Sequence, residues 1–428
     1  MKLPGIVLLV VLGLLLAGAP AVTARTWTNT DGAEFEGELL RSEGTVAVIM
    51  VAGQEMRWPL AELSNADRVF VFRQRRATVA ATPTPTPRAT PAAPDEKRAA
   101  AAEADAAFNA YNAAFLVRAG GRTFYRKNST TQEPNRLWVQ ATTIQLAEDA
   151  YDRSRSGAHR QLVADLLTSF LAQEGVDWSY DSWNDDMAWM CIACVRGYQI
   201  TYNPAFLNAA ANNWKMAYDR GCDDTFGGGI WEDNKTKDSK NALSNNPMVV
   251  AGCALYQITH EASYLTRCRA IYDWAYANLV DPATGQVNEG IAHKGRLESD
   301  NVYNSGAFVN AANAMHNVTG EDRYHRDALL AADHVVRKWA VLAHHHRGEN
   351  CWSDQFARGL AFFCRDNKLW GRYRGWLLAN AKSSWSFRRR DLNVTWNDWQ
   401  KPTPEDECSS LECLGAVVLQ QMIPLMEP

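Results

Sequence analysis

The sequence predicts a mainly all-α fold, in which one large helical domain follows a small β module. From about residue 98 onward, apolar residues recur at helical spacing, and short loops with Gly, Asn, Asp and Pro separate these stretches. A similar turn recurs at 202–204, 259–261 and 319–321, where one helix ends and the next begins. The residues after the apolar N-terminus instead form short runs typical of β-strands. Stacked helical hairpins are the arrangement that this repeat favours.

The helical part contains about a dozen candidate helices and no strand run of comparable strength. We expect them at 99–115, 137–154, 159–174, 186–201, 204–220, 246–259, 262–278, 304–318, 321–341, 353–366, 371–385 and 409–422. Twelve helices closed into two concentric rings, an (α/α)6 barrel, fit both this length and the repeated turns.

The bulk composition limits the classes of function. A chain of 428 residues is too long for one ordinary core and favours two unequal domains. The net charge of -4 provides no general field that would attract nucleic acid or an anionic membrane. Sixteen tryptophans offer flat faces for stacking against sugar rings, although a Trp-rich helical core explains any single one equally well.

The first 24 residues have the pattern of a signal peptide. Lys2 supplies positive charge, residues 6–16 form an apolar run, and Val22-Thr23-Ala24 is a cleavage site of small residues. The run is too short for a confident membrane span, and a retained N-terminal anchor is the alternative. We therefore expect a secreted or periplasmic protein whose mature chain has no membrane span and does not bind nucleic acid.

Residues 25–75 predict a small β module. Strands are expected at 25–28, 34–40, 45–51 and 55–60, and Asp31-Gly32 and Ala52-Gly53 provide turns. The order Arg25-Thr26-Trp27-Thr28, Asp31-Gly32, Pro59-Leu60, Leu63-Ser64 and Asp67 resembles the SH3-like homology domain of exported planctomycete and verrucomicrobial proteins. That resemblance implies a binding or spacer module of unknown ligand, and a plain β appendage remains the alternative. Residues 76–97, rich in Pro, Thr and Ala, form a stiff linker to the (α/α)6 domain expected at 98–428.

Adjacent aspartates, Asp185 and Asp186, are the best candidates for chemistry. A glycosidic bond usually needs two carboxyl groups, one to protonate the leaving oxygen and one to act as nucleophile or base. Neighbours on a helix point about 100° apart, so both can face one cavity only at the start of a helix. Their short reach favours the separation of about 5 Å that accompanies retention of configuration. The alternative is that the pair simply caps the helix.

Three later segments accompany this pair. Gly227-Gly228-Gly229-Ile230-Trp231 is a glycine-rich loop that ends in an aromatic residue, without the Gly-Lys-Ser/Thr of a phosphate-binding loop. Lys240-Asn241 and Ser244-Asn245 follow, and Tyr303-Asn304-Ser305-Gly306 opens a later helix.

In this order, Tyr180-Asp181, Asp185-Asp186, Trp189 and the three later segments resemble glycoside hydrolase family 76, the endo-α-1,6-mannanases. The resemblance implies an (α/α)6 barrel that cleaves α-1,6-mannan with retention, with Asp185 as nucleophile and Asp186 as general acid/base. Further motif positions are implied as substrate contacts: Trp183, Trp189, Gly228, Gly229, Trp231, Asn241, Asn245, Tyr303 and Asn304. The sequence departs from the usual family motif at two places, Trp183-Asn184 before the pair and Asn246 in place of Glu. These departures bear on which sugars the subsites prefer. No metal or organic cofactor is expected.

Other functions remain open at this point. A cell-wall mannosyl transglycosylase would use the same two aspartates, with a sugar in place of water as acceptor. A catalytically silent glycan-binding protein would leave recognition to the β module, and retained aspartates argue against it. Another (α/α)6 family would require a basic cleft for a uronate or a histidine pair for epimerisation.

Several other polar clusters receive a simpler interpretation. Asp223-Asp224 and Glu232-Asp233 are read as loop surface or subsite contacts. His344-His345-His346 is read as a solvated helix end, because consecutive residues rarely ligate one metal ion. The cysteines number nine, so at least one is unpaired within the chain, and Cys351–Cys364 and Cys408–Cys413 are candidate local bridges.

Overall fold

A computed structural model describes residues 24–43, 46–64, 67, 70–71, 94–342 and 353–426. The predicted signal peptide up to residue 23, most of the predicted linker, His344-His345-His346 and Cys351 lie outside the described residues.

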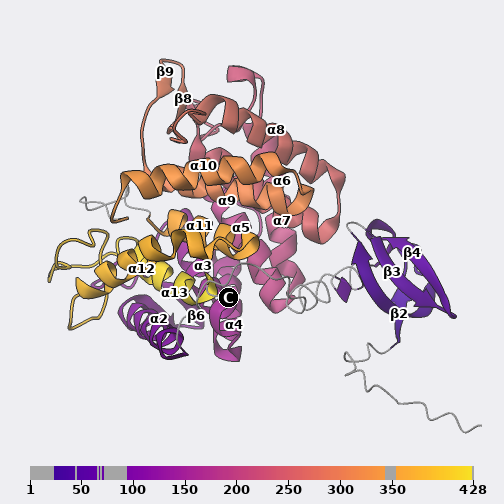
Figure 1. Cartoon of the computed structure of the whole chain (residues 1–428), viewed down its shortest axis with the longest axis horizontal. Coiled ribbons are helices and arrows are strands. Elements are labelled where there is room, and N and C mark those ends of the chain that lie inside the picture. The colour runs from indigo at the N-terminus through magenta and orange to yellow at the C-terminus, as the bar shows by residue number, and fades with distance from the viewer. Residues whose placement is uncertain are drawn as a thin grey trace, which may run out of the picture. The chain divides into compact units, whose positions relative to one another are not determined.

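The N-terminal unit is a four-stranded antiparallel sheet (Figure 1). Its strands are β1 (Arg25–Thr28), β2 (Glu34–Glu43), β3 (Val46–Val51) and β4 (Gln54–Pro59), in that order, followed by the 3-10 turn η1 (Leu60–Glu62). Trp27 is fully buried and donates its indole N–H to the carbonyl of Gly37 at 2.9 Å. The Asp67 carboxylate accepts from Arg25 at 2.6 Å and from the Thr28 N–H at 2.7 Å, which ties the segment after the sheet to the first strand.

The helical unit contains twelve α-helices within the described residues. They are α2 (Pro94–Phe115), α3 (Leu137–Ser154), α4 (Gly157–Glu174), α5 (Asn184–Thr201), α6 (Pro204–Gly221), α7 (Ala242–Thr259), α8 (Ala262–Leu279), α9 (Val302–Thr319), α10 (Asp322–Lys338), α11 (Ser353–Asn367), α12 (Trp370–Ser386) and α13 (Leu414–Met426). The prediction of a mainly all-α protein with a small N-terminal β sheet is confirmed.

One turn geometry joins five successive helix pairs. In each turn a residue in the left-handed region closes one helix, and the next residue is the N-cap of the following helix. The closing residues are Arg155 (φ 54), Tyr202 (φ 63), His260 (φ 59), Gly320 (φ 70) and Lys368 (φ 58). This link lets the first helix end and the second begin within two residues, so the helices return antiparallel. The turns predicted from the sequence at 202–204, 259–261 and 319–321 belong to this set.

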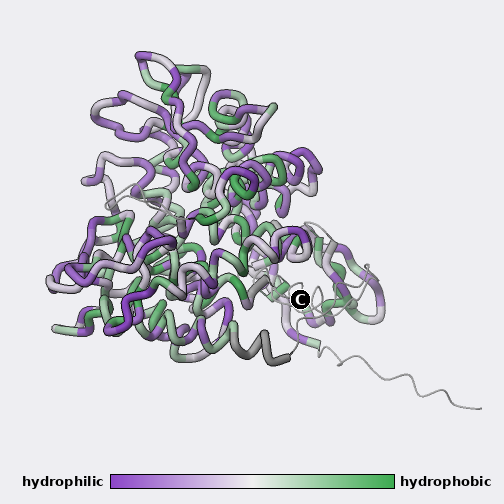
Figure 2. Tube along the Cα trace, turned by 60° about the vertical axis from the view of Figure 1, so that its left-hand side comes forward, coloured by the Kyte–Doolittle hydropathy of each residue, from purple (hydrophilic) through white to green (hydrophobic). Residues whose placement is uncertain are grey.

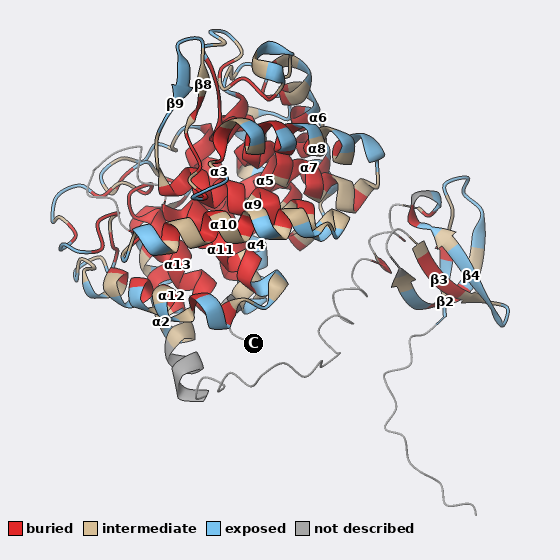
Figure 3. Ribbon diagram, turned by 45° about the horizontal axis from the view of Figure 1, so that its top comes forward, coloured by how far each residue is buried: buried red, intermediate tan, exposed pale blue. Residues whose placement is uncertain are grey.

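Burial divides the helices into inner and outer sets (Figure 3). Helices α3, α5 and α9 are buried over most of their length, whereas α4 and α10 bury only one face. Hydrophobic and hydrophilic residues are interleaved along the helical part of the chain, as amphipathic packing requires (Figure 2). Among the inner helices, α3 contacts α5 and α13, and α11 contacts α9 and α13, so α13 lies between α3 and α11.

Short strands in the helical unit were not predicted. The pair β5 (Leu116–Ala119) and β6 (Arg122–Tyr125) forms one hairpin, and β7 (Ser239–Asn241), β8 (Gly290–Ala292) and β9 (Gly295–Leu297) form a small sheet. A strand of three or four residues is too short to show a recognisable alternation of apolar and polar residues in the sequence. The β7–β8 pairing joins the loop before α7 to the loop before α9, so residues about fifty positions apart meet.

The predicted Cys408–Cys413 bridge is wrong, because no disulfide joins the two residues. Their side chains are hydrogen-bonded to each other, and the Arg389 guanidinium lies 3.7 Å from the Cys408 sulfur, which lowers the pKa of the Cys408 thiol to about 7. Cys364 is also a free, buried thiol, and its predicted partner Cys351 lies outside the described residues.

Candidate active site

A cavity with a volume of about 500 Å³ lies at the N-terminal ends of the inner helices. Its lining comes from the starts of α3, α5, α7 and α9 and from two intervening loops: Arg136, Trp138, Trp183, Asp185, Asp186, Glu232, Asn241, Leu243, Glu289 and Tyr303. A space of this size accommodates small-molecule or sugar ligands. The predicted dyad is therefore part of a cavity wall.

The start of α5 is fixed by the segment that follows the glycine-rich loop. The main-chain N–H of Asn184 donates to the Glu232 carbonyl at 2.8 Å, and its side-chain amide donates to the Trp231 carbonyl at 2.8 Å. The Arg220 guanidinium donates to the Asn184 side-chain oxygen at 2.7 Å. These bonds leave the next two residues, Asp185 and Asp186, at the cavity.

Neither aspartate is the N-cap of α5. Trp183 occupies the cap position and makes no side-chain capping bond. The Asp186 carboxyl instead bonds to the main chain of Trp138 and to the Asp181 side chain. The Asp185 carboxyl does bond to the main-chain N–H groups of Asp185 and Asp186 in the first turn. Capping therefore accounts for part of the role of Asp185 but not for Asp186.

Burial gives the dyad unusual proton affinities. Only 8% of each aspartate is exposed, and no cation forms an ion pair with either within the described part of the chain. Desolvation, followed by the nearby Glu232 carboxylate, raises the pKa of Asp185 to about 8. Desolvation, followed by the charges of Asp185 and Asp181, raises the pKa of Asp186 well above its usual range. Ionising both of these adjacent carboxyl groups is unfavourable. At least one of them therefore holds a proton at neutral pH.

Two glutamates lie on another part of the cavity wall. Glu289 accepts three hydrogen bonds on Oε2, from the Asn301 amide at 3.1 Å, the Tyr303 hydroxyl at 3.1 Å and the Asn304 amide at 2.9 Å. Glu232 accepts from the Ser239 hydroxyl at 2.7 Å and from the Asn241 side chain. Burial raises the pKa of Glu232.

The glycine-rich loop is held by a buried lysine. The Lys240 ammonium is fully buried and donates to the Asp223 carboxylate at 2.8 Å and to the carbonyls of Asp223, Thr225 and Gly228. Hydrogen bonds from Lys240, Trp231 and Thr225 outweigh the effect of burial and hold the pKa of Asp223 far below its usual range. Gly229 has φ 77, and a Cβ there would lie 2.5 Å from the Trp274 ring, so the position requires glycine.

The structure places the predicted substrate contacts in two groups. Trp183, Asn241 and Tyr303 line the cavity together with the dyad, and Trp183 is 45% exposed. The remaining predicted contacts are absent from the lining: Trp189, Gly228, Gly229, Trp231, Asn245 and Asn304.

The second group has structural contacts instead. Trp231 is 2% exposed and donates its indole N–H to Asp223 at 2.6 Å. Asn245 accepts from the Ile230 N–H at 2.7 Å, and Asn304 supports Glu289. Trp189 is buried in α5, and Gly228 and Gly229 pack against Trp274. Their direct contact with a sugar stays a prediction.

Four lining residues were not singled out in the sequence: Arg136, Trp138, Leu243 and Glu289. Arg136 and Trp138 flank the first residue of α3, and the guanidinium lies 5.6 Å from the Trp138 ring. The sequence does offer one signal for this part of the wall. Trp138 is an aromatic residue in the first turn of an inner helix, and Tyr303 occupies the same position in α9. Glu289 has no such signal, because it is a single acid in a loop.

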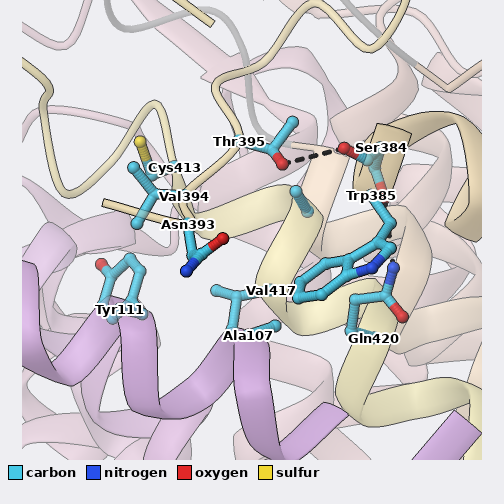
Figure 4. A pocket seen from close by; sticks show the side chains of 11 residues that line it. Ala107, Tyr111, Ser384, Trp385, Asn393, Val394, Thr395, Cys413, Val417 and Gln420 are labelled. Carbon is cyan, nitrogen blue, oxygen red and sulfur yellow. Dashed lines mark hydrogen bonds between the residues drawn. The ribbon is translucent and has the colours of Figure 1, made fainter. Parts of the chain in front are cut away.

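A second described cavity is much smaller and lies between α2, α12, α13 and the 393–395 segment (Figure 4). Its volume is about 10 Å³, which holds little more than one water molecule. Among the described residues, no group of His, Cys, Asp and Glu is arranged to hold a metal ion. None of the described helices is long and apolar enough to cross a membrane.

Comparison with known proteins agrees with this geometry. The family model described as Glycosyl hydrolase family 76 matches residues 97–421. Mannan endo-1,6-alpha-mannosidase DCW1 of Eremothecium gossypii is 27% identical over 224 residues, which are 45% of this chain and 49% of that protein. The match thus spans about half the length of this curated relative.

Solved structures show the same fold. The GH76A α-1,6-mannanase from Salegentibacter sp. HEL1_6 aligns with a TM-score of 0.71 and 25% identity, over 77% of this chain and 100% of that one. An inactive variant of that enzyme, in which two adjacent aspartates are replaced by asparagine, was solved with α-1,6-mannotriose. It aligns with a TM-score of 0.71 and 24% identity, over 77% of this chain and 100% of that one.

Proposed function

The chain belongs to glycosyl hydrolase family 76 and is a glycoside hydrolase, and from this premise we propose that it cleaves α-1,6-mannosidic bonds within a mannan-type polysaccharide with retention of configuration. The observation that carries the proposal is the adjacent Asp185 and Asp186 in the wall of the cavity, without a paired cation. The relatives named as endo-1,6-α-mannosidase and α-1,6-mannanase support the choice of substrate.

The proton affinities of the dyad support a division of labour. Asp186, whose pKa is raised by burial and by two neighbouring carboxyls, keeps its proton and is suited to general acid catalysis. Asp185 gives up its proton first and attacks the anomeric carbon as a carboxylate, while Asp186 protonates the departing oxygen. In the second step the Asp186 carboxylate takes a proton from water, which breaks the glycosyl ester on Asp185. The sugar leaves with its original configuration after two inversions.

The remaining lining suits a neutral, extended sugar. Trp183 offers an exposed aromatic face on which a pyranose ring can stack, whereas Trp138 lines the wall as a buried ring. Tyr303 and Asn241 add polar contacts, and each also bonds to a glutamate of the wall. A long polymer that binds across several such positions is cleaved internally.

Incubation with linear α-1,6-mannan tests this proposal. The protein should release oligosaccharides, and Asp185→Asn and Asp186→Asn should each lower kcat by about 10³-fold or more, as expected for loss of a nucleophile or an acid/base. Asp224→Asn is the matched control, because it belongs to another adjacent acidic pair, is exposed and lies outside the lining. Wild-type protein that leaves this mannan intact while cleaving another polymer would refute the substrate. Two fully active dyad variants would refute the site.

We also propose that the protein acts outside the cytoplasm, as a secreted or periplasmic enzyme, on the basis of the signal-peptide pattern in residues 1–24. The β module then serves as a spacer or as a binding unit of its own. N-terminal sequencing of the exported protein should begin near Arg25, and a retained Met1 would contradict this.

A further inference from the structure

We propose that Glu232 and Glu289 are specificity-determining residues, which bind hydroxyl groups of a neutral sugar and reject glycans that carry phosphate or carboxylate groups near the cleaved bond. The inference rests on the proposed function, because it concerns the same cavity. The inference is about which glycans the cavity binds, whereas the dyad is responsible for cleaving the glycosidic bond.

The first support is the charge of the lining. Four carboxyl groups, from Asp185, Asp186, Glu232 and Glu289, share this wall with one basic residue, Arg136. Even with a proton held on the dyad, negative charge exceeds positive charge. An anionic group that enters a confined cavity of this sign meets repulsion that water screens only partly.

The second support is the way in which Glu289 is held. Three neutral donors, Asn301, Tyr303 and Asn304, converge on its Oε2 atom. All three donors are neutral side chains, and no cation takes part in this arrangement. The other oxygen, Oε1, receives none of these three bonds and is available as an acceptor for a ligand in the cavity.

The third support is the rigid attachment of Glu232. Its main-chain carbonyl accepts from Asn184, directly before the dyad, and its main-chain N–H donates to the Ser239 carbonyl at 2.9 Å. The side chain accepts from the Ser239 hydroxyl. The glutamate is therefore fixed relative to Asp185 and Asp186, so a sugar positioned for cleavage meets it at a defined place.

The chemistry of the substrate fits both roles. A hexopyranose linked through positions 1 and 6 keeps its other ring hydroxyls, which donate hydrogen bonds to carboxylate oxygens. An ionised phosphate group or a uronate carboxylate offers only acceptors at the place that it occupies, where these glutamates require donors. Discrimination thus combines attraction to one ligand class and repulsion of another.

Binding to the inactive double variant Asp185→Asn/Asp186→Asn separates selection from catalysis. The probes are α-1,6-mannotetraose and its monophosphate, measured by calorimetry at low and high salt. We expect the neutral sugar to bind at least about tenfold more tightly, and added salt to reduce that ratio. Adding Glu289→Gln or Glu232→Gln should lower the ratio about threefold or more, mainly through better binding of the phosphate.

The control is Glu298→Gln, which removes one exposed carboxylate outside the lining and should leave the ratio unchanged. Equal affinities for the two probes, or a ratio that neither glutamine variant changes, would overturn this inference and leave the proposed function intact. A background protein that binds neither probe would overturn the proposed substrate and the inference with it.

Discussion

Two pairs of adjacent aspartates in the helical domain have opposite environments. Asp223 of the Asp223-Asp224 pair accepts from the buried Lys240 ammonium and the Trp231 indole, and these bonds hold its pKa far below the usual range. Among the described residues no cation pairs with Asp185 or Asp186, and burial raises the pKa of both. The same dipeptide therefore supports a loop in one place and stores a proton in the other. Its surroundings, rather than its sequence, decide which.

The opposite shifts have opposite consequences for stability. A carboxyl whose pKa is lower in the folded state adds stability above its unfolded pKa, and this is lost as the pH falls. A carboxyl whose pKa is higher in the folded state costs stability as the pH rises above its unfolded value. Asp223 is thus a stabilising group at neutral pH, and the dyad is a destabilising one.

The largest stability effect is expected when the ammonium is removed from the first pair. Lys240→Met leaves the carbonyls of Asp223, Thr225 and Gly228 without their buried donor, while the Asp223 carboxylate keeps its bond from Trp231. The loss should lower the free energy of unfolding by about 3–5 kcal/mol. Urea unfolding measures this. Lys237→Met is the matched control, since Lys237 also pairs with Asp223, at 3.6 Å, but is 41% exposed and should cost under about 0.5 kcal/mol. Equal losses would show that burial of Lys240 is unimportant.

The next effect is a gain of stability at the dyad. Asp185→Asn cannot ionise, so it avoids the loss that wild-type protein suffers as the pH rises from about 4 to about 8. We expect the variant to be more stable by about 1–3 kcal/mol at pH 8, a difference that vanishes near pH 4. Unfolding at both pH values tests this, with Asp224→Asn as the control. A less stable Asn variant at pH 8 would contradict the assigned shift.

The smallest effect is a change in the pH profile. Burial is the main cause of the raised pKa of Asp185, and the Glu232 charge is the next. Glu232→Gln removes that charge, so Asp185 ionises at lower pH and the acidic limb of kcat/KM should move down by up to about one pH unit. Glu298→Gln should leave the profile unchanged. A limb that moves upward would mean that Glu232 does not repel Asp185.

Much of the fold was predictable because the helices share one local pattern, apolar residues at helical spacing between short polar turns. Helices predicted at 137–154 and 204–220 agree with α3 and α6 to within a residue. Predictions failed where the tertiary structure overrides local signals. Helix α7 begins at Ala242, four residues before the prediction, and carries Pro247 inside it. Helix α13 begins at Leu414, five residues after its predicted start, because 408–410 form a loop bonded to residues 127–129.

The site was predictable in part. Asp185, Asp186 and Trp183 could be found because they cluster at one helix start, next to a recognisable loop. Glu289 could not be found from the sequence. Its position in the cavity wall depends on the pairing of β8 with β7 and on three donors near the start of α9. Trp231 and Asn245 accompany the dyad in sequence, yet the structure uses them to hold the glycine-rich loop.

The most direct test of the proposed mechanism is covalent trapping on the dyad. The Asp186→Ala variant, incubated with an α-mannobiosyl fluoride whose leaving group needs no protonation, should accumulate a glycosyl ester. Peptide mass spectrometry should place the ester on Asp185, and azide should release an α-glycosyl azide. An ester on another residue, or no ester together with a β-configured product, would contradict Asp185 as the nucleophile of a retaining enzyme.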